Sequence, residues 1–570
     1  MALTEFFPPV GCRDGVPSLV YVTGDTIKVN HSKTSLVTGS SNRFKECRYR
    51  SIAKKPGTDF DTVVLYNSTW FNDSINLRDN DDNLVVECYG SDNSILSRSY
   101  HSLIRVKKDL EMKLKKRLQK HIAKNSPAEI FNVLMIGIEG NSKQNLQRHM
   151  PKTRNYLLKV LNAIELKKYN KIGDHTYPNV IPILTGKTEE EFLHQNWNWS
   201  GLFDDINHQF VWSDLSNAGY RTGLFLDTTN KTAFHFFKRA WDKPPVDYYY
   251  RATLLDLERD PLVRYKVPNC VGDTPEVTYN FNFWTQMAST FTNPKTHPYF
   301  GYSFYNHLTH SNSNGASAGD DLYLRIFLEL KQRNIINNTI VIFFSDHGAR
   351  VGKIRHTYNG VIESMMPHVF LILPPWFRRK YPDVYRVLEL NQERLTTNKD
   401  LYMTLQVVLN FQGKPGIGNI KQKGISLFNE IPRERTCDDA GIPFEFCVCN
   451  KLVKANVSAD LTVSLATEVT NRLWYYYDRH VNICNRLTLK YVHSVWEIHL
   501  DHEENTRGKS MYQIIISTTP NDALYEAKLV FDNSTKIITV VGDVIRLNMY
   551  RGQDNCMNNP KLKPFCHCRG

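Results

Sequence analysis

The chain has 570 residues, which is too long for one ordinary domain of about 100–200 residues. Hydrophobic residues make up 41% and aromatic residues 12% of it, enough for a sizeable core, so global disorder is excluded. No stretch approaches the ~18–20 uninterrupted apolar residues that a bilayer span needs. The opening residues, "MALTEFFPPV", lack the profile of a signal peptide, so we expect either no targeting segment or one that preceded this chain.

Sequons and cysteines favour the secretory route. Seven of the eleven cysteines lie beyond residue 430, including the pairs Cys447/Cys449 and Cys566/Cys568. Such a cluster predicts disulfides in an oxidising compartment, although pairs of this spacing also bind structural zinc, and an odd total leaves at least one thiol free or bonded to another chain. We expect a secreted or luminal glycoprotein, or the ectodomain of an anchored one. The candidate glycosylation sites are Asn30, Asn67, Asn72, Asn198, Asn230, Asn337, Asn456 and Asn533.

Short β-rich runs come first in the chain. Residues 1–104 contain "DTIKV", "DTVVLY" and "NLVVECY" between polar turns, which predicts a small N-terminal β-rich domain closed by Cys47 and Cys88. Residues 105–130 form the next unit, a basic linker helix.

The linker helix is amphipathic. In "RVKKDLEMKLKKRLQKHIAK" the apolar residues Val106, Leu110, Leu114 and Leu118 recur every four positions, and seven lysines and two arginines lie among the other positions. We expect a solvated basic face; the alternative is a role in attracting anionic substrates or lipid surfaces. The net charge is +13, but no zinc-finger, phosphate-loop or RNA-binding motif accompanies it, so nucleic-acid binding is not expected.

Continuous apolar runs mark residues 131–412. They are "FNVLMIGI", "RTGLFLD", "YFGYSFYNHL", "IVIFF" and "HVFLILP", and they alternate with helix-like segments such as "DDLYLRIFLELKQRN". This predicts an α/β core with a mostly parallel sheet and helices on both faces. We expect residues 413–454 to be a cysteine-bearing connector and residues 455–570 a C-terminal β-rich disulfide domain.

Metal-seeking side chains follow three of the predicted strands. Their ends deliver Glu139, His310, and the pair Asp346 and His347, and Thr176 lies in the loop "GDHTYPNVIPILTG". Oxygen and imidazole ligands suit zinc or a similar divalent ion, and a hydroxyl held against such an ion becomes a usable nucleophile. Each residue alone has a plainer interpretation as a turn residue, a solvated acid or a structural histidine.

Taken together, these motifs resemble the alkaline-phosphatase-like superfamily of phosphatases, phosphodiesterases and sulfatases. The closer resemblance is to a secreted or membrane-anchored family, domain of unknown function 229, through "MPKTRNYL", "IPILTGKTEEEF", "SDHGARVGKIRHTYNGVIESMMP" and "RTCDDAGIPFEFCVC". The resemblance implies Thr176 as nucleophile and Asp346 and His347 as ligands of one ion. The superfamily has aspartate where this chain has Glu139, an acid one methylene longer.

A second ion is implied less completely. The family reads His-Asp where this chain reads His310-Ser311. The later histidine that it uses corresponds to His356 or His368, and His356, in the better-matched stretch, is the expected ligand. The nearest other acids, Asp320 and Asp321, open the following predicted helix, and we expect them to cap it.

Two functions follow from these patterns. The first is a metal-dependent hydrolase or transferase that acts on an anionic phosphate or sulfate ester, with Thr176 as nucleophile and one or two divalent ions, zinc foremost. The alternative is a pseudoenzyme whose metal site is degraded at Glu139 and Ser311, and which acts as an extracellular binding protein for a partner or a glycan.

Overall fold

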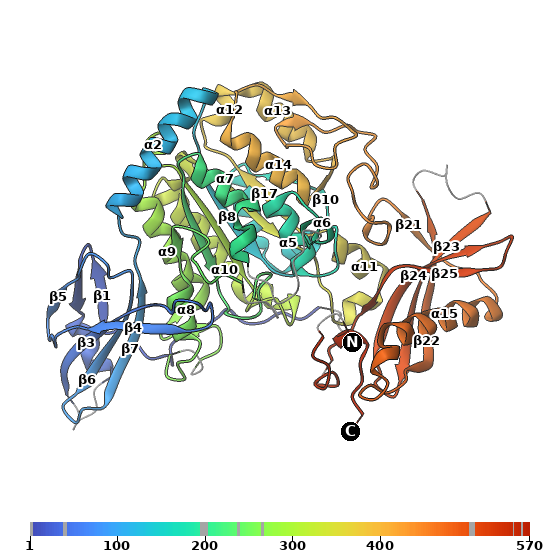
Figure 1. Cartoon of the computed structure of the whole chain (residues 1–570), viewed down its shortest axis with the longest axis horizontal. Coiled ribbons are helices and arrows are strands. Elements are labelled where there is room, and N and C mark those ends of the chain that lie inside the picture. The colour runs from blue at the N-terminus through green and yellow to red at the C-terminus, as the bar shows by residue number, and fades with distance from the viewer. Residues whose placement is uncertain are drawn as a thin grey trace.

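The structure is a computed structural model that describes residues 4–37, 43–193, 203–235, 240–263, 267–500, 508–550, 552–559 and 562–569. Among these residues, no helix is both long and apolar enough to cross a membrane. Figure 1 shows three regions in chain order: a small β region, a large α/β core, and a β region that carries the C-terminus.

Two antiparallel sheets form the N-terminal region. The first has the order β1-β2-β5 and the second the order β4-β3-β6-β7. As expected, a disulfide between Cys47 and Cys88 joins β3 to β6. The elements are β1 (Val20–Thr23), β2 (Thr26–Val29), α1 (His31–Val37), β3 (Phe44–Lys54), β4 (Thr62–Asn67), β5 (Ser74–Asn76), β6 (Asn83–Gly90) and β7 (Ile95–Ser102).

The basic linker helix is α2 (Lys108–Asn125). Leu114 and Leu118 are its buried residues, as the spacing predicted. Val106 was wrongly placed on the same apolar face: it precedes the helix and is 58% exposed. An extended lead-in does not keep the helical period, so the four-residue spacing has no meaning there.

A seven-stranded sheet with the order β12-β11-β15-β8-β16-β17-β9 organises the core. Its pairings are parallel from β12 to β16, and β17 and β9 add to it antiparallel. Most of the chain's other sheets are antiparallel or very short, so the structure as a whole is mixed α/β. The strands are β8 (Asn132–Ile138), β9 (Ile164–Glu165), β11 (Arg221–Leu226), β12 (Tyr248–Tyr249), β15 (Tyr299–Tyr305), β16 (Thr339–Ser345) and β17 (Val369–Ile372).

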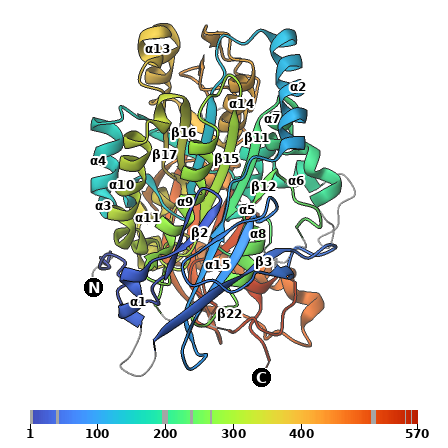
Figure 2. The same cartoon turned by 90° about the vertical axis from the view of Figure 1, so that its left-hand side faces the viewer.

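Helices cover both faces of this sheet, because successive side chains of each strand point to opposite sides. Val133 and Met135 of β8 belong to one hydrophobic cluster with residues of α5, α7 and α14. Leu134 and Ile136 belong to another with residues of α9 and α10 (Figure 2). The helices are α3 (Lys143–His149), α4 (Pro151–Lys159), α5 (Thr176–Thr185), α6 (Glu189–Leu193), α7 (Val211–Asn217), α8 (Arg251–Leu257), α9 (Glu276–Thr290), α10 (Ala316–Gln332), α11 (Tyr358–Met365), α12 (Phe377–Lys380), α13 (Pro382–Asn391) and α14 (Asn398–Leu409).

Short strand pairs complete the core and the connector. The three pairs between described residues are β10 (Lys168–Asn170) with β18 (Leu395–Thr397), β13 (Cys270–Val271) with β14 (Thr274–Pro275), and β19 (Gly416–Ile417) with β20 (Asn429–Glu430).

The last region is a five-stranded antiparallel sheet. The β pattern of the sequence missed α15, a 19-residue helix that covers one face of the sheet with Leu465, Val469 and Leu473. Its apolar residues recur at a spacing of four, which is the period of a helix rather than of a strand. The elements are β21 (Lys451–Lys454), α15 (Ala459–Tyr477), β22 (Thr488–His499), β23 (Lys509–Thr519), β24 (Leu524–Asp532) and β25 (Ile538–Arg546).

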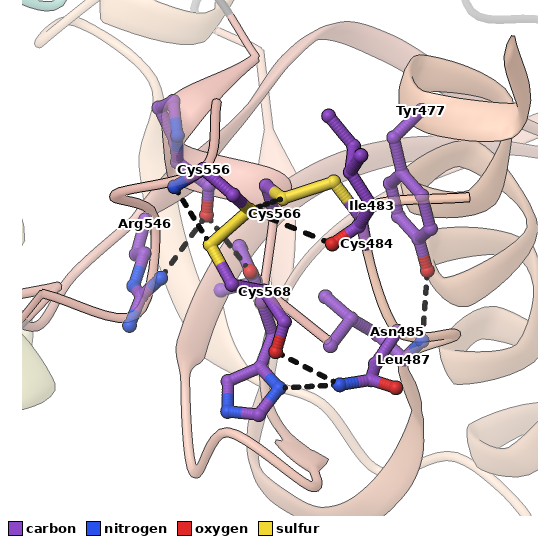
Figure 3. The surroundings of a disulfide bond; sticks show 12 residues. Tyr477, Ile483, Cys484, Asn485, Leu487, Arg546, Cys556, Cys566 and Cys568 are labelled. Carbon is purple, nitrogen blue, oxygen red and sulfur yellow. Dashed lines mark hydrogen bonds between the residues drawn. A yellow bond between two sulfur atoms is a disulfide. The ribbon is translucent and has the colours of Figure 1, made fainter. Parts of the chain in front are cut away.

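Disulfides cross-link the chain, as the cysteine cluster predicted. Figure 3 shows two neighbouring bridges near the C-terminus, Cys484–Cys566 and Cys556–Cys568, in which the Sγ atoms of Cys556 and Cys566 lie 3.6 Å apart. Asn485 donates to the carbonyl oxygen of Cys568 at 3.1 Å, which links the segment after Cys484 to the C-terminal segment. The remaining bridges are Cys12–Cys270 and Cys437–Cys447, and Cys449 lies outside all five.

Candidate metal and nucleophile site

Two adjacent strands deliver three candidate ligands to one edge of the sheet. In the β8–β16 ladder, Ile138 is paired with Ser345, so the residues that follow each strand emerge side by side. These are Glu139 after β8, and Asp346 and His347 after β16. All three are buried, and they offer one ligand atom each within 4.8 Å of one another.

Thr176 faces this group from the start of α5, not from a loop as the sequence suggested. Its Oγ1 donates to Glu139 Oε1 at 3.0 Å and lies 3.5 Å from His347 Nε2. Pro178 is the third residue of this helix. Proline is tolerated there because the N–H groups of the first helical turn have no partner within the helix, so its missing N–H costs no hydrogen bond. The hydroxyl therefore sits at a helix N-terminus, where the dipole favours negative charge.

Asn179 explains why the chain before Thr176 turns in this way. Its Oδ1 accepts from the backbone N–H groups of Ile172 and Gly173, at 2.9 and 3.1 Å, and its Nδ2 donates to the carbonyl oxygens of Gly173 and His175. The side chain is fully buried. One amide thus ties the approach loop to the first turn of α5 and sets the position of the Thr176 hydroxyl.

Two buried carboxylates share the site without enough hydrogen bonds. Asp346 Oδ1 accepts from the Gly140 N–H at 3.0 Å, but Asp346 Oδ2 and Glu139 Oε2 are buried and have no hydrogen-bond partner. Burial, and then the charge of Asp346, raise the pKa of Glu139 well above its usual value. A divalent cation bound between the two carboxylates would satisfy both orphaned oxygens and offset the repulsion, so the residues fit a metal.

His347 presents a ring nitrogen to the same point. Its Nδ1 lies 2.7 Å from the carbonyl oxygen of Gly348, which can only accept, so Nδ1 carries the proton and Nε2 keeps its lone pair. Nε2 is 3.1 Å from Asp346 Oδ2. Burial lowers the pKa of His347, which favours the neutral form that ligates metals.

The remaining predicted ligands lie further out or outside this cluster. His310 Nε2 is 3.7 Å from Glu139 Oε1, and its side chain is 37% exposed. Desolvation of the covered part of the ring lowers the pKa of His310 to about 4. Ser311 is exposed. His368 is fully buried, its Nδ1 bonds to the Asn141 carbonyl oxygen at 2.9 Å, and it is not one of the three clustered ligands. The side chain of His356 lies outside the described residues.

Asp320 does not cap its own helix, contrary to expectation. It lies one turn inside α10, and its two oxygens accept from the backbone N–H groups of Lys152 and Thr153 at 3.0 and 2.8 Å. It therefore caps α4, which begins at a proline and has no side-chain cap of its own. Asp321 instead forms an ion pair with Lys152 at 2.7 Å.

Sequence reasoning missed a group of charged residues beside the nucleophile. Asp174, two positions before Thr176, pairs with Arg350 at 3.1 Å and lies 3.7 Å from Lys171. Burial lowers the pKa of Lys171 to about 8, whereas Arg350 and Lys171 hold the pKa of Asp174 below its usual range against the effect of burial. The signal was present in "SDHGAR" and "KIGDHT", where charged residues adjoin the predicted ligands.

Most of the candidate glycosylation sites are accessible. The asparagines that are exposed are Asn67, Asn72, Asn230, Asn337, Asn456 and Asn533. Asn30 is half-buried, and Asn198 lies outside the described residues. Their modification stays a prediction.

Comparison with known proteins places the chain in a family. Residues 20–493 match the sequence profile described as "Protein of unknown function (DUF229)", and the chain belongs to that family, as the motifs indicated. No curated protein matches the chain in sequence.

Several solved structures with some likeness to the chain are distant from it in sequence. A protein of the alkaline phosphatase superfamily from Vibrio parahaemolyticus is 11% identical, with 76% of this chain and 91% of that chain covered and a TM-score of 0.35. The PsFucS1 sulfatase from Pseudoalteromonas sp. is 12% identical, with coverages of 76% and 89% and a TM-score of 0.36. The lipoteichoic acid synthase LtaP from Listeria monocytogenes is 12% identical, with coverages of 65% and 98% and a TM-score of 0.36.

Proposed function

We propose that the protein is a metal-dependent hydrolase or transferase of phosphate or sulfate esters, with Thr176 as its nucleophile. The observation that carries this proposal is the Thr176 hydroxyl, 3.0 Å from Glu139 and 3.5 Å from His347, beside two buried carboxylate oxygens that have no hydrogen-bond partner. The candidate nucleophile thus lies at the same site as the candidate metal ligands, two of which are buried carboxylates.

Glu139, Asp346, His347 and Thr176 would hold one divalent ion, and zinc suits this mixture of oxygen and nitrogen ligands. Such an ion, when bound, lowers the proton affinity of a hydroxyl and neutralises charge on the ester oxygens. A second ion has weaker support, because His310 is partly exposed and Ser311 offers a hydroxyl in place of a carboxylate.

The protein's own groups perform the remaining tasks. Glu139 Oε1 accepts the hydrogen bond from Thr176 and takes up its proton as the threonine oxygen attacks phosphorus or sulfur. The bond to the ester oxygen breaks, and that oxygen takes a proton from water and leaves as the alcohol. The cationic Arg350 and Lys171, held by Asp174, attract the anionic ester to this side of the nucleophile. Water then releases phosphate or sulfate from Thr176, or a second alcohol accepts the group in a transferase.

Two measurements test the proposal. Elemental mass spectrometry of protein purified without chelator should find one zinc-like ion per chain, and Thr176→Ala should abolish turnover of aryl phosphate and aryl sulfate esters while Thr176→Ser retains part of it. Thr185→Ala, at the other end of α5, is the matched control, because its hydroxyl bonds only to nearby backbone: it donates to the Ile181 carbonyl oxygen and accepts from the Lys187 N–H. Unchanged turnover in Thr176→Ala would refute the nucleophile.

The pseudoenzyme alternative rests on Glu139 and Ser311, the two positions that depart from the family pattern. It predicts an inactive wild type and a gain of activity in the double variant Glu139→Asp, Ser311→Asp. An active wild type that the double variant does not improve would contradict it.

A further inference from the structure

A line of unpaired positive charge runs along the outer face of α2. Lys113, Lys116, Lys120 and Lys124 are exposed and follow one another at spacings of three and four residues, so they lie in a row over roughly 16 Å of helix. They are absent from the ion pairs between described residues. The ion pairs around this helix are made instead by Lys107 with Asp82 and by Glu111 with Arg221.

Another face of the helix, with the buried Leu114 and Leu118, packs against the core. Arg117, next to Lys113 and Lys120 on the helix surface, adds a polar tie by donating to the Ser216 carbonyl oxygen and hydroxyl at 3.1 and 3.0 Å. A Cβ on Gly219 would lie 2.5 Å from the Leu118 nitrogen, so only glycine permits this close approach of the loop after α7. The row of lysines therefore stands on a rigid support at the outer edge of the molecule (Figure 1).

We propose that this row, which we call the α2 lysine row, binds a sulfated polysaccharide. A linear polyanion fits a straight array of ammonium groups, and each charge that it neutralises releases a counterion, which makes such binding strong at low salt and salt-dependent. The five disulfides are typical of an oxidising compartment, where sulfated polysaccharides rather than nucleic acids are the available linear polyanions.

A membrane surface fits the same charges less well. A helix that lies in a membrane interface buries its apolar face among the lipids, but the apolar face of α2 is already used against the core. Anionic lipids are also concentrated in the cytoplasmic leaflet.

The α2 lysine row is separate from the proposed catalytic site. The end of the helix leads into the amino end of β8, whereas Glu139 follows the carboxyl end of this strand, which is itself about 23 Å long for seven extended residues. A polysaccharide bound on α2 thus leaves the nucleophile accessible, and the row acts as an anchor rather than as part of the reacting site.

Heparin chromatography of the full chain tests this proposal, with Lys113, Lys116, Lys120 and Lys124 all replaced by glutamine. The variant should elute at clearly lower salt, and the slope of log K against log salt should fall by about 3, the counterion release expected for four contacts. The matched control replaces four exposed lysines elsewhere and changes the net charge equally: Lys421, Lys451, Lys454 and Lys509.

The elution and the stability of the variants show whether the α2 lysine row binds the polysaccharide. Elution of the α2 variant with the wild type, or an equal loss in the control, would show that net charge alone retains the protein and would overturn the proposal. Binding to phosphatidylserine vesicles but not to heparin would replace the polysaccharide with a membrane. Equal thermal stability of the variants would establish that loss of binding is not loss of fold.

Discussion

The replacement Glu139→Gln should have opposite effects with and without metal. The ligand atoms of Glu139, Asp346 and His347 lie within 4.8 Å of one another, and two unit charges at that distance repel by about 3 kcal/mol at an effective dielectric constant of about 20. Removing one charge should therefore raise the free energy of unfolding of the metal-free protein by up to about 3 kcal/mol. The same change removes a ligand, so saturating zinc should stabilise the variant less than the wild type.

The pH dependence of stability is a second test of whether the charge of Glu139 destabilises the metal-free protein. Burial and Asp346 raise the pKa of Glu139, so the folded state holds this proton more tightly than the unfolded state does. Stability of the metal-free wild type should then fall as the pH rises above 4.5, the ordinary value, towards the folded pKa. The variant lacks this loss, so its advantage should vanish at acid pH and be largest at neutral and alkaline pH.

Urea unfolding followed from pH 4 to 9, in chelator and in excess zinc, measures both effects. Glu165→Gln is the matched control: Glu165 is buried too but pairs with Arg154 at 2.7 Å, so its replacement should destabilise the protein with and without zinc. The reasoning fails if Glu139→Gln is less stable than the wild type in chelator at pH 8, or if zinc stabilises both proteins equally.

Three further changes probe charges and bridges elsewhere. Burial lowers the pKa of Lys171 to about 8, so above that pH the unfolded chain binds more protons than the folded one. The free energy of unfolding should therefore rise by about 3 kcal/mol from pH 8 towards 10.5. Lys171→Met should remove that rise when unfolding is measured over this pH range. Arg435→Ala should cost about 3–5 kcal/mol by urea unfolding, since it leaves the fully buried Asp400 without its partner at 2.8 Å, and an unchanged midpoint would contradict this. Replacing Cys484 and Cys566 by alanine opens a loop of 82 residues and should cost about 4 kcal/mol in calorimetry, whereas wild-type stability would show that the bridge adds nothing.

Much of the candidate site was predictable because its residues follow recognisable strands. The apolar runs before Glu139 and before Asp346 predicted buried strands, and parallel neighbours bring the ends of such strands together at one sheet edge. The family resemblance is confirmed over residues 20–493. The catalytic role of these residues and the division of the chain into domains stay predictions.

Other features depended on contacts that no local pattern records. The segment Thr-Tyr-Pro-Asn has turn-forming residues and predicts a loop, but the structure has a helix that begins at Thr176. The buried side chain of Asn179 stabilises its first turn by accepting from the Ile172 N–H. Asp320 looked like a cap for its own helix, but α10 packs against α4 and gives the acid to a different set of backbone N–H groups.

By itself, the sequence determined which strands are buried, where their polar ends fall and that Leu114 and Leu118 lie on the apolar face of α2, and it favoured disulfides over a zinc site for the late cysteines. Periodicity and composition carry that information because they act over a few neighbouring residues. Only the tertiary structure decided that Arg350 and Lys171 meet Asp174 beside the nucleophile, and that two carboxylate oxygens lie buried without partners. Those facts depend on how segments far apart in the chain pack, and on the low dielectric that packing creates around their charges.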